Sequence, residues 1–203
     1  MDEFNTPMMK QYAQIKKQYQ DCLLFYRMGD FYELFMDDAQ IGAKVLNITL
    51  TGRPKGKDGR IPMAGVPFHA VDVYLNKLVK AGYKVAICEQ LTLPNKKGII
   101  ERDVVRIVTP GTILDENALN KKDNNFIISI LIEGETLAIA WADLSTGFLS
   151  GIEKISDNPI KQLQQELAKI HPVECILSEE HYNDPEILKA LKAEKSLNLF
   201  PFL

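Results

Sequence analysis

The chain has 203 residues, of which 46% are hydrophobic and 25% are charged, and its formal net charge at pH 7 is −3. This composition is ordinary for a soluble globular protein with one large domain or two small ones. No apolar run approaches the roughly 18 residues that a membrane-spanning helix needs, and the acidic N-terminus is unlike a signal peptide. We therefore expect a cytoplasmic protein without a membrane partner.

The charge is divided unevenly along the chain. Residues 1–110 carry 16 Lys and Arg against 12 Asp and Glu, whereas residues 111–203 carry 8 against 15. Such an asymmetry indicates a basic half that binds a ligand and an acidic half that meets a partner.

Cysteine and histidine give no sign of a metal site. The three cysteines, Cys22, Cys88 and Cys175, are far apart, odd in number and set in apolar runs. They predict buried reduced thiols rather than a disulfide framework or a zinc knuckle. The three histidines are isolated from one another, and His69 is expected to begin a helix rather than to bind a metal.

Helices and strands alternate through the first part of the chain. Thr6 can cap a helix that has Pro7 at its first position, the apolar run 23–28 predicts a buried strand, and residues 31–46 recur at helical spacing. The further predicted elements are strands at 48–51, 61–65, 85–88 and 104–108 and a helix over 71–79 that ends near Gly82. These elements predict an α/β domain with a mixed sheet over residues 1–113.

The second part of the chain has a different pattern. Residues 114–125 are polar and aperiodic, so we interpret them as a linker to a second domain over residues 126–203. The predicted elements of this domain are strands at 126–132, 136–142 and 148–153, a helix from about 158, a strand at 173–177 and a helix at 185–193. This order is the opening of a ribonuclease-H-like fold. Residues 200–203 are apolar without a closing element, so we expect this domain to be incomplete.

The most informative segment is residues 27–35, Arg-Met-Gly-Asp-Phe-Tyr-Glu-Leu-Phe. Phe31 stands two residues before Glu33, just after a Gly-Asp break, where a strand is predicted to turn into a helix. An aromatic wedge beside a hydrogen-bonding acid indicates insertion into stacked bases and inspection of one of them. Two structural interpretations stay open: Phe31 as a core residue, and Glu33 as the partner of Asp30 in a helix capping box.

A basic segment follows at residues 53–60. It holds four cations, Arg53, Lys55, Lys57 and Arg60, together with one Pro and two Gly, which predicts a loop. The loop is either a solvated surface or a set of contacts to DNA phosphates. Phosphate contacts would position the protein on DNA without specifying a sequence.

Several blocks of the chain occur in a familiar order. They are residues 6–12, 25–35, 62–70, 85–90, 105–112 and 142–147. In this order the blocks resemble the start of the bacterial MutS mismatch-repair proteins. The resemblance covers the mismatch-binding domain of that family and most of its connector domain, so it implies that this chain is a fragment without the lever, clamp and ATPase domains.

The resemblance implies roles for particular residues. Phe31 would stack on a mispaired or unpaired base from the minor-groove side of double-stranded DNA, and Glu33 would hydrogen-bond the same base. Arg27 is expected to be structural. The basic residues at 53–60 lie where the family has a loop near the DNA backbone. We expect no catalytic residue in this chain, and little mismatch preference from the fragment alone at physiological salt.

The resemblance also implies partners and a location. The second domain would dock a MutL-type repair protein, and the protein would be cytoplasmic in a bacterium and associated with the nucleoid when it is bound to DNA. ATP and Mg²⁺ are expected only for the ATPase domain, because no Gly-x-x-x-x-Gly-Lys-Ser/Thr loop occurs in these residues. A homodimer is expected only for the full-length protein.

Two alternatives from other classes remain. The chain could be a partner-docking module that does not bind DNA by itself. It could also be a metal-dependent nuclease, because ribonuclease-H-like folds can hold two metal ions, and Asp143 near a strand end is a candidate ligand.

Overall fold

The computed structural model describes residues 6–55, 59–92, 99–113 and 124–202. The chain divides into two compact units, Met1–Thr109 and Pro110–Leu203, and each is considered by itself. Most of the predicted linker, residues 114–123, lies outside the described residues, but its last residue, Asn125, is buried in the second unit. Within the described ranges, no helix is long and apolar enough to cross a bilayer.

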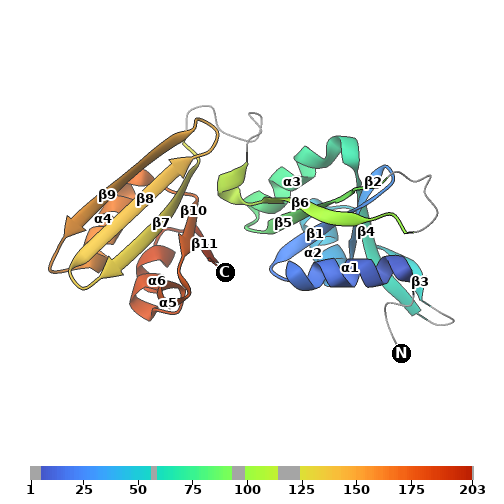
Figure 1. Cartoon of the computed structure of the whole chain (residues 1–203), viewed down its shortest axis with the longest axis horizontal. Coiled ribbons are helices and arrows are strands. Elements are labelled where there is room, and N and C mark those ends of the chain that lie inside the picture. The colour runs from blue at the N-terminus through green and yellow to red at the C-terminus, as the bar shows by residue number, and fades with distance from the viewer. Residues whose placement is uncertain (1–5, 56–58, 93–98, 114–123, 203) are drawn as a thin grey trace. The chain divides into compact units, whose positions relative to one another are not determined.

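The first unit is built on a six-stranded mixed sheet (Figure 1). Its strands are β1 (Cys22–Met28), β2 (Phe31–Phe35), β3 (Thr51–Lys55), β4 (Gly59–Pro67), β5 (Lys84–Gln90) and β6 (Arg102–Val108). They lie in the order β3-β4-β2-β1-β5-β6. The pair β1–β5 is parallel and the other neighbours are antiparallel, which confirms the predicted mixed sheet.

Helices cover both faces of this sheet. Helix α1 (Pro7–Gln18) is capped by the Thr6 side chain and packs Met9, Tyr12 and Ile15 into a core with side chains of β1, β4 and β5. Helices α2 (Met36–Leu46) and α3 (Val71–Lys80) contact each other on the opposite face. The short 3-10 helix η1 (Phe68–Ala70), which contains His69, leads into α3. Helix α1 thus packs against the face of β2 that bears Phe35.

Three predicted segments of the first unit are wrong in their limits. The strand predicted at 48–51 is β3, which begins only at Thr51. Residues 31–35 form strand β2 rather than the first turns of a helix, and α2 begins only at Met36. The basic segment 53–60 is not one long loop, because Arg53 and Lys55 belong to β3 and Arg60 belongs to β4. Residues 31–35 pair with β1 and β4, and residues 51–55 pair with β4. This pairing between strands overrides what the local spacing of residues predicts.

The second unit has a five-stranded sheet in the order β11-β10-β7-β8-β9. The strands are β7 (Phe126–Glu133), β8 (Thr136–Asp143), β9 (Phe148–Ile155), β10 (Glu174–Leu177) and β11 (Asn198–Pro201). The helices are α4 (Pro159–Ile170), α5 (Glu179–Tyr182) and α6 (Pro185–Lys192), and the short helix η2 (Pro110–Thr112) begins the unit. The predicted order of three antiparallel strands, a helix and a strand is confirmed.

The end of the second unit differs from the prediction. The sequence predicts no closing element at residues 200–203, but residues 198–201 form β11, which pairs in parallel with β10. Phe200 lies opposite Ile176 in this pair. A strand of only four residues is too short to show a periodicity, so its pairing could not be recognised from the sequence alone. The predicted burial of the cysteines is confirmed for all three.

Candidate functional site

The turn between β1 and β2 presents an aromatic side chain at its end. Met28 pairs with Phe31, which leaves Gly29 and Asp30 as a two-residue turn. Gly29 has φ of +60°, a conformation that suits the first position of a tight hairpin turn and that glycine adopts without strain. The backbone N–H of Phe68 donates to the Asp30 carbonyl at 2.9 Å, so the turn is also tied to the end of β4. The side chain of Phe31, 45% exposed, is therefore held on an anchored hairpin.

Exposure changes steadily along one face of β2. Phe31, Glu33 and Phe35 alternate with residues of the other face, so their side chains project to the same side. Phe31 is exposed, Glu33 is half-buried and Phe35 is fully buried, with its ring 5.0 Å from that of Tyr12 in α1. Helix α1 covers Phe35 and leaves Phe31 open, so the core interpretation of Phe31 is wrong.

Glu33 carries a polar atom that the protein does not satisfy. Its Oε2 atom is buried and has no hydrogen-bond partner among the described residues. Burial raises the pKa of the Glu33 carboxyl group above its ordinary value. The capping-box interpretation is wrong, because Glu33 lies inside a strand and Phe35, not Asp30, stands at the N-cap of α2. A buried oxygen without a donor leaves this carboxyl group able to bond a ligand.

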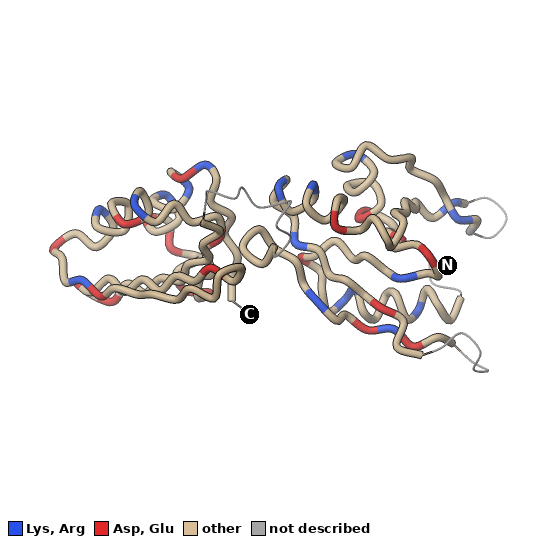
Figure 2. The backbone as a smooth tube through the Cα atoms, turned by 90° about the horizontal axis from the view of Figure 1, so that it is seen from above, with Lys and Arg blue, Asp and Glu red and all other residues tan. Residues whose placement is uncertain are grey.

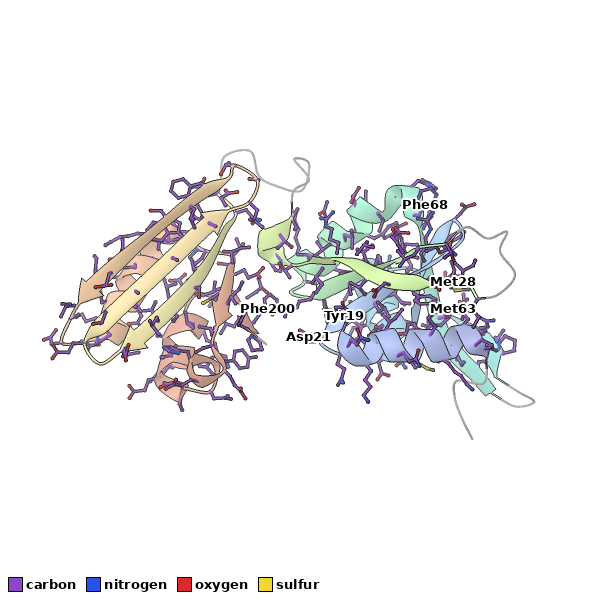
Figure 3. The ribbon with its side chains drawn as sticks, in the orientation of Figure 1. Tyr19, Asp21, Met28, Met63, Phe68 and Phe200 are labelled. Carbon is purple, nitrogen blue, oxygen red and sulfur yellow. The ribbon has the colours of Figure 1, made fainter. Side chains whose placement is uncertain are left out.

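A cluster on the opposite face of the sheet holds the same hairpin. The Arg27 guanidinium lies 3.9 Å from the ring centre of Phe68 and 5.4 Å from that of Tyr32. Arg27 also pairs with Glu89 at 3.7 Å, and the Tyr32 hydroxyl donates to the same carboxylate. Figure 3 places Met28, Met63 and Phe68 at one end of the sheet and Tyr19 and Asp21 at the other. These contacts show Arg27 in the structural role that the sequence predicted.

Arg102 supports the backbone of β1 near the turn. Its Nε atom donates to the Arg27 carbonyl at 2.7 Å, and its Nη1 atom donates to the Gln11 side chain at 3.3 Å. The Tyr26 hydroxyl donates to the same Gln11 oxygen at 2.6 Å, and the Arg102 guanidinium lies 4.9 Å from the Tyr26 ring centre. Arg27 and Arg102 thus fix the end of β1, and with it the start of β2.

Of the four basic residues, the structure describes the side chains of Arg53 and Arg60, and neither lies next to Phe31. Arg60 lies near the start of β4, whereas the residue opposite Phe31 is Pro67 at its end, about 23 Å away at about 3.3 Å per residue. Arg53 lies on the edge strand β3 and its Nη1 atom contacts the Met8 sulfur at 3.6 Å. Lys57 lies outside the described residues, and so does the placement of the Lys55 side chain. Backbone positions of both charge signs are scattered over each unit (Figure 2).

Asp143, the candidate nuclease residue, is buried, and both of its carboxylate oxygens accept hydrogen bonds. Its Oδ1 atom accepts from the Ser145 N–H at 2.9 Å and from the Ser145 hydroxyl at 2.6 Å, and its Oδ2 atom accepts from the Asn125 N–H at 3.1 Å. Despite the opposing effect of burial, these hydrogen bonds hold the pKa of Asp143 below its ordinary value. Among the described residues, no group of three or more potential metal-binding side chains includes it. The structure therefore gives the nuclease alternative no support.

Comparison with known proteins identifies both units. The family described as MutS domain I matches residues 6–117, which is more than half of the chain, and the family described as MutS domain II matches residues 125–200. The chain belongs to the MutS family. This membership confirms the predicted fold class, a mixed α/β chain made of the first two MutS domains in succession.

Individual MutS relatives agree with this assignment. The DNA mismatch repair protein MutS of Caldanaerobacter subterraneus is 50% identical over 92% of this chain and 22% of its own length. The proteins of the same name from Clostridioides difficile and Staphylococcus carnosus are 47% and 45% identical, over 92% and 95% of this chain. The chain spans about a fifth of the length of these MutS relatives.

The sequence did not point to every residue that shapes this candidate site. Gly65 was interpreted as the end of a short strand, but β4 runs through it to Pro67 and pairs it with Glu33. A glycine inside a strand often marks a place where another group approaches closely, so the signal existed. Phe68, which stacks on Arg27, gave no comparable signal.

Proposed function

We propose that the first unit recognises mispaired and unpaired bases in double-stranded DNA, with Phe31 as the stacking wedge and Glu33 as the hydrogen-bond partner of the base. The observation that carries the proposal is the pairing of an exposed aromatic ring at a hairpin end with a buried, unsatisfied carboxyl oxygen on the same face of β2. Membership of the MutS family and the names of the relatives support it.

The physical argument concerns the ease of deforming DNA. Insertion of an aromatic ring costs a few kcal/mol of base unstacking, and a mismatch has already lost part of that stacking energy. The protein then distinguishes a mismatch from a correct base pair mainly by how easily the DNA deforms at that position. Stacking of a base on Phe31 returns roughly 1–3 kcal/mol. A rigid hairpin favours this mechanism, because the ring is held before DNA binds.

Glu33 adds a hydrogen bond to the base, although nearby phosphates repel its negative charge. An ionised carboxylate is repelled by the DNA backbone, but its burial already raises the pKa of Glu33, and nearby phosphates raise it further. The group can then accept a hydrogen bond from a base, or donate one after it takes up a proton. Either bond would satisfy the oxygen that lacks a partner.

The test compares DNA binding by a full-length protein that carries this chain with binding by its Phe31→Ala variant. The ligands are a duplex with a G·T pair or a one-base bulge and the matching homoduplex. We expect roughly a 5- to 150-fold loss of affinity for the mismatch, because the lost stacking is about 1–3 kcal/mol. Homoduplex binding, which depends on phosphate contacts, should change little.

A matched control comes from the second unit. Phe148 is 47% exposed, close to the 45% of Phe31, and lies at the start of β9. Phe148→Ala removes a similar area of aromatic surface far along the chain from the hairpin, so it should leave the mismatch preference intact. Full discrimination by the Phe31→Ala variant would refute the wedge.

For the second unit we propose docking of a MutL-type repair protein. Its acidic charge and the exposed apolar side chains of Leu149 and Ile155 on the edge strand β9 support an interaction surface. This role could persist without DNA binding, which is the alternative function of the chain. ATP hydrolysis with Mg²⁺ and dimer formation are proposed only for the full-length protein.

A further inference from the structure

Gly65 lies directly opposite Glu33 in the antiparallel pair of β2 and β4. Residues that face each other in such a pair project their side chains to the same side of the sheet. On the other flank of β2, Glu33 lies opposite Tyr26, a large side chain that is fully buried. The space beside Glu33 is therefore filled on the β1 side and open on the β4 side, where Gly65 has no side chain.

The carboxyl group of Glu33 occupies this open space. A Cβ atom added to Gly65 would lie 2.6 Å from Oε2, 2.8 Å from Oε1 and 2.8 Å from Cδ of Glu33. All three separations are shorter than van der Waals contact, so the carboxyl group and a side chain at position 65 cannot both keep these places. The atoms that would have to move are those at the end of the Glu33 side chain.

We infer that Gly65 is a positioning residue for base recognition: its missing side chain forms the notch in which the Glu33 carboxyl group lies beside Phe31. The inference rests on the proposed role of Glu33 in the mismatch contact. Phe31 sits two residues away on the same face, opposite Pro67, so the notch sets the place of the carboxyl group relative to the ring. A base that stacks on Phe31 would meet the acid only where this notch holds it.

An alanine at position 65 should disturb the site and spare the fold. Gly65 has no left-handed backbone conformation, so alanine can adopt its φ and ψ without strain. Alanine also reduces the conformational freedom of the unfolded chain, which favours folding. The clash is relieved when the flexible Glu33 side chain rotates outward into water. The expected damage is thus confined to the carboxyl group.

The experiment measures mismatch and homoduplex affinities for the full-length protein with Gly65→Ala, with Glu33→Ala and with both. We expect Gly65→Ala to lower the mismatch preference roughly tenfold, the size of one lost hydrogen bond to a charged group, with homoduplex affinity within about twofold of the parent. The double variant should be no worse than Glu33→Ala alone, because both changes remove the same contact.

The sheet offers a matched control. Gly52 of β3 also lies inside a strand, and the three atoms nearest to a Cβ atom there all belong to Arg60, the first of them its Cβ atom at 3.0 Å. Gly52→Ala therefore repeats the chemical change in the same sheet, and it should leave the ratio of mismatch to homoduplex affinity unchanged. A loss of that ratio in Gly52→Ala equal to that in Gly65→Ala would overturn the inference.

A second measurement follows the carboxyl group itself. Proton titration of Glu33, observed by NMR in the 203-residue chain, should show a lower pKa in Gly65→Ala than in the parent, because a carboxyl group released into water loses the effect of burial. An unchanged Glu33 pKa together with an unchanged mismatch preference would overturn the inference. If Glu33→Ala itself kept full discrimination, the proposed base contact would fail instead, so the two failures are distinguishable.

Discussion

The two units hold buried carboxyl groups near hairpin turns, but in opposite states. Glu33 in the first unit has an oxygen without a partner in the described part of the chain, and burial raises the pKa of its carboxyl group. Asp143 in the second unit accepts three hydrogen bonds from Ser145 and Asn125, and its pKa is lowered. The difference separates a carboxyl group whose oxygens are satisfied by nearby donors from one with an oxygen that no described residue satisfies. Burial of an acid alone would not have told the two apart.

The largest expected effect is a loss of stability when Asp143, the carboxyl group with hydrogen-bond donors, is replaced. Asp143→Ala leaves the buried N–H of Asn125 and both donors of Ser145 without their acceptor. We expect the free energy of unfolding of the second unit to fall by about 2–4 kcal/mol, with no change in mismatch preference. Trp141, the single tryptophan, packs against the core of this unit and reports its unfolding in urea by fluorescence.

A nearby control shows whether the loss belongs to the hydrogen bonds. Glu153 lies exposed on β9, so Glu153→Ala should change the free energy of unfolding by less than about 0.5 kcal/mol. If Asp143→Ala were as mild as this control, the contrast between the two carboxyl groups would break down.

The next largest expected effect is a difference in acid stability between the two units. Hydrogen bonds from Lys154 and Lys169 lower the pKa of Glu166 from 4.5 to about 2, and hydrogen bonding lowers that of Asp143 as well. Groups with lowered pKa stabilise the folded state above their unfolded pKa and lose that contribution as the pH falls through the folded pKa. The second unit should therefore lose stability between about pH 4.5 and pH 2.

The first unit should respond differently in this range. Glu33 and Asp38 have raised pKa values, so the folded state takes up their protons more readily and is relieved of a cost as the pH falls. Asp21 opposes this trend, but 46% of its side chain is exposed and its pair with Lys84 is screened by water. Amide hydrogen exchange of β1 and β2, set beside Trp141 fluorescence, measures both units. Earlier acid unfolding of the first unit would contradict the comparison.

The smallest expected effect is a change of stability when Glu33 is replaced. Glu33→Gln removes a partly buried charge, so at pH 7 the free energy of unfolding should stay the same or rise by up to about 1 kcal/mol. The gain should vanish in acid, where Glu33 itself is neutral. Amide exchange of the first unit at the two pH values measures the difference. A clear loss of stability in Glu33→Gln would show that the carboxylate is bonded within the protein.

The sequence predicted much of the fold where the pattern was local. The helix that begins at Pro7, the hairpin about Gly134 and the helix near residue 159 all follow from capping residues, alternation and periodicity close in the chain. The predicted start of the helix at residue 31 was wrong, because Leu34 and Phe35 fit helical spacing and strand spacing equally well. Pairing with β1 on one side and β4 on the other decided for a strand.

The sequence by itself determined the family of this chain and named Phe31 and Glu33 as the pair to examine. Only the tertiary structure decided what surrounds them. Whether Phe31 is a core or a surface residue depends on how much of the sheet α1 covers. The position of the Glu33 carboxyl group depends on the space at Gly65, which is 32 residues further along the chain. Strand register is set by long-range pairing and by the packing of whole faces, so no local pattern contains it.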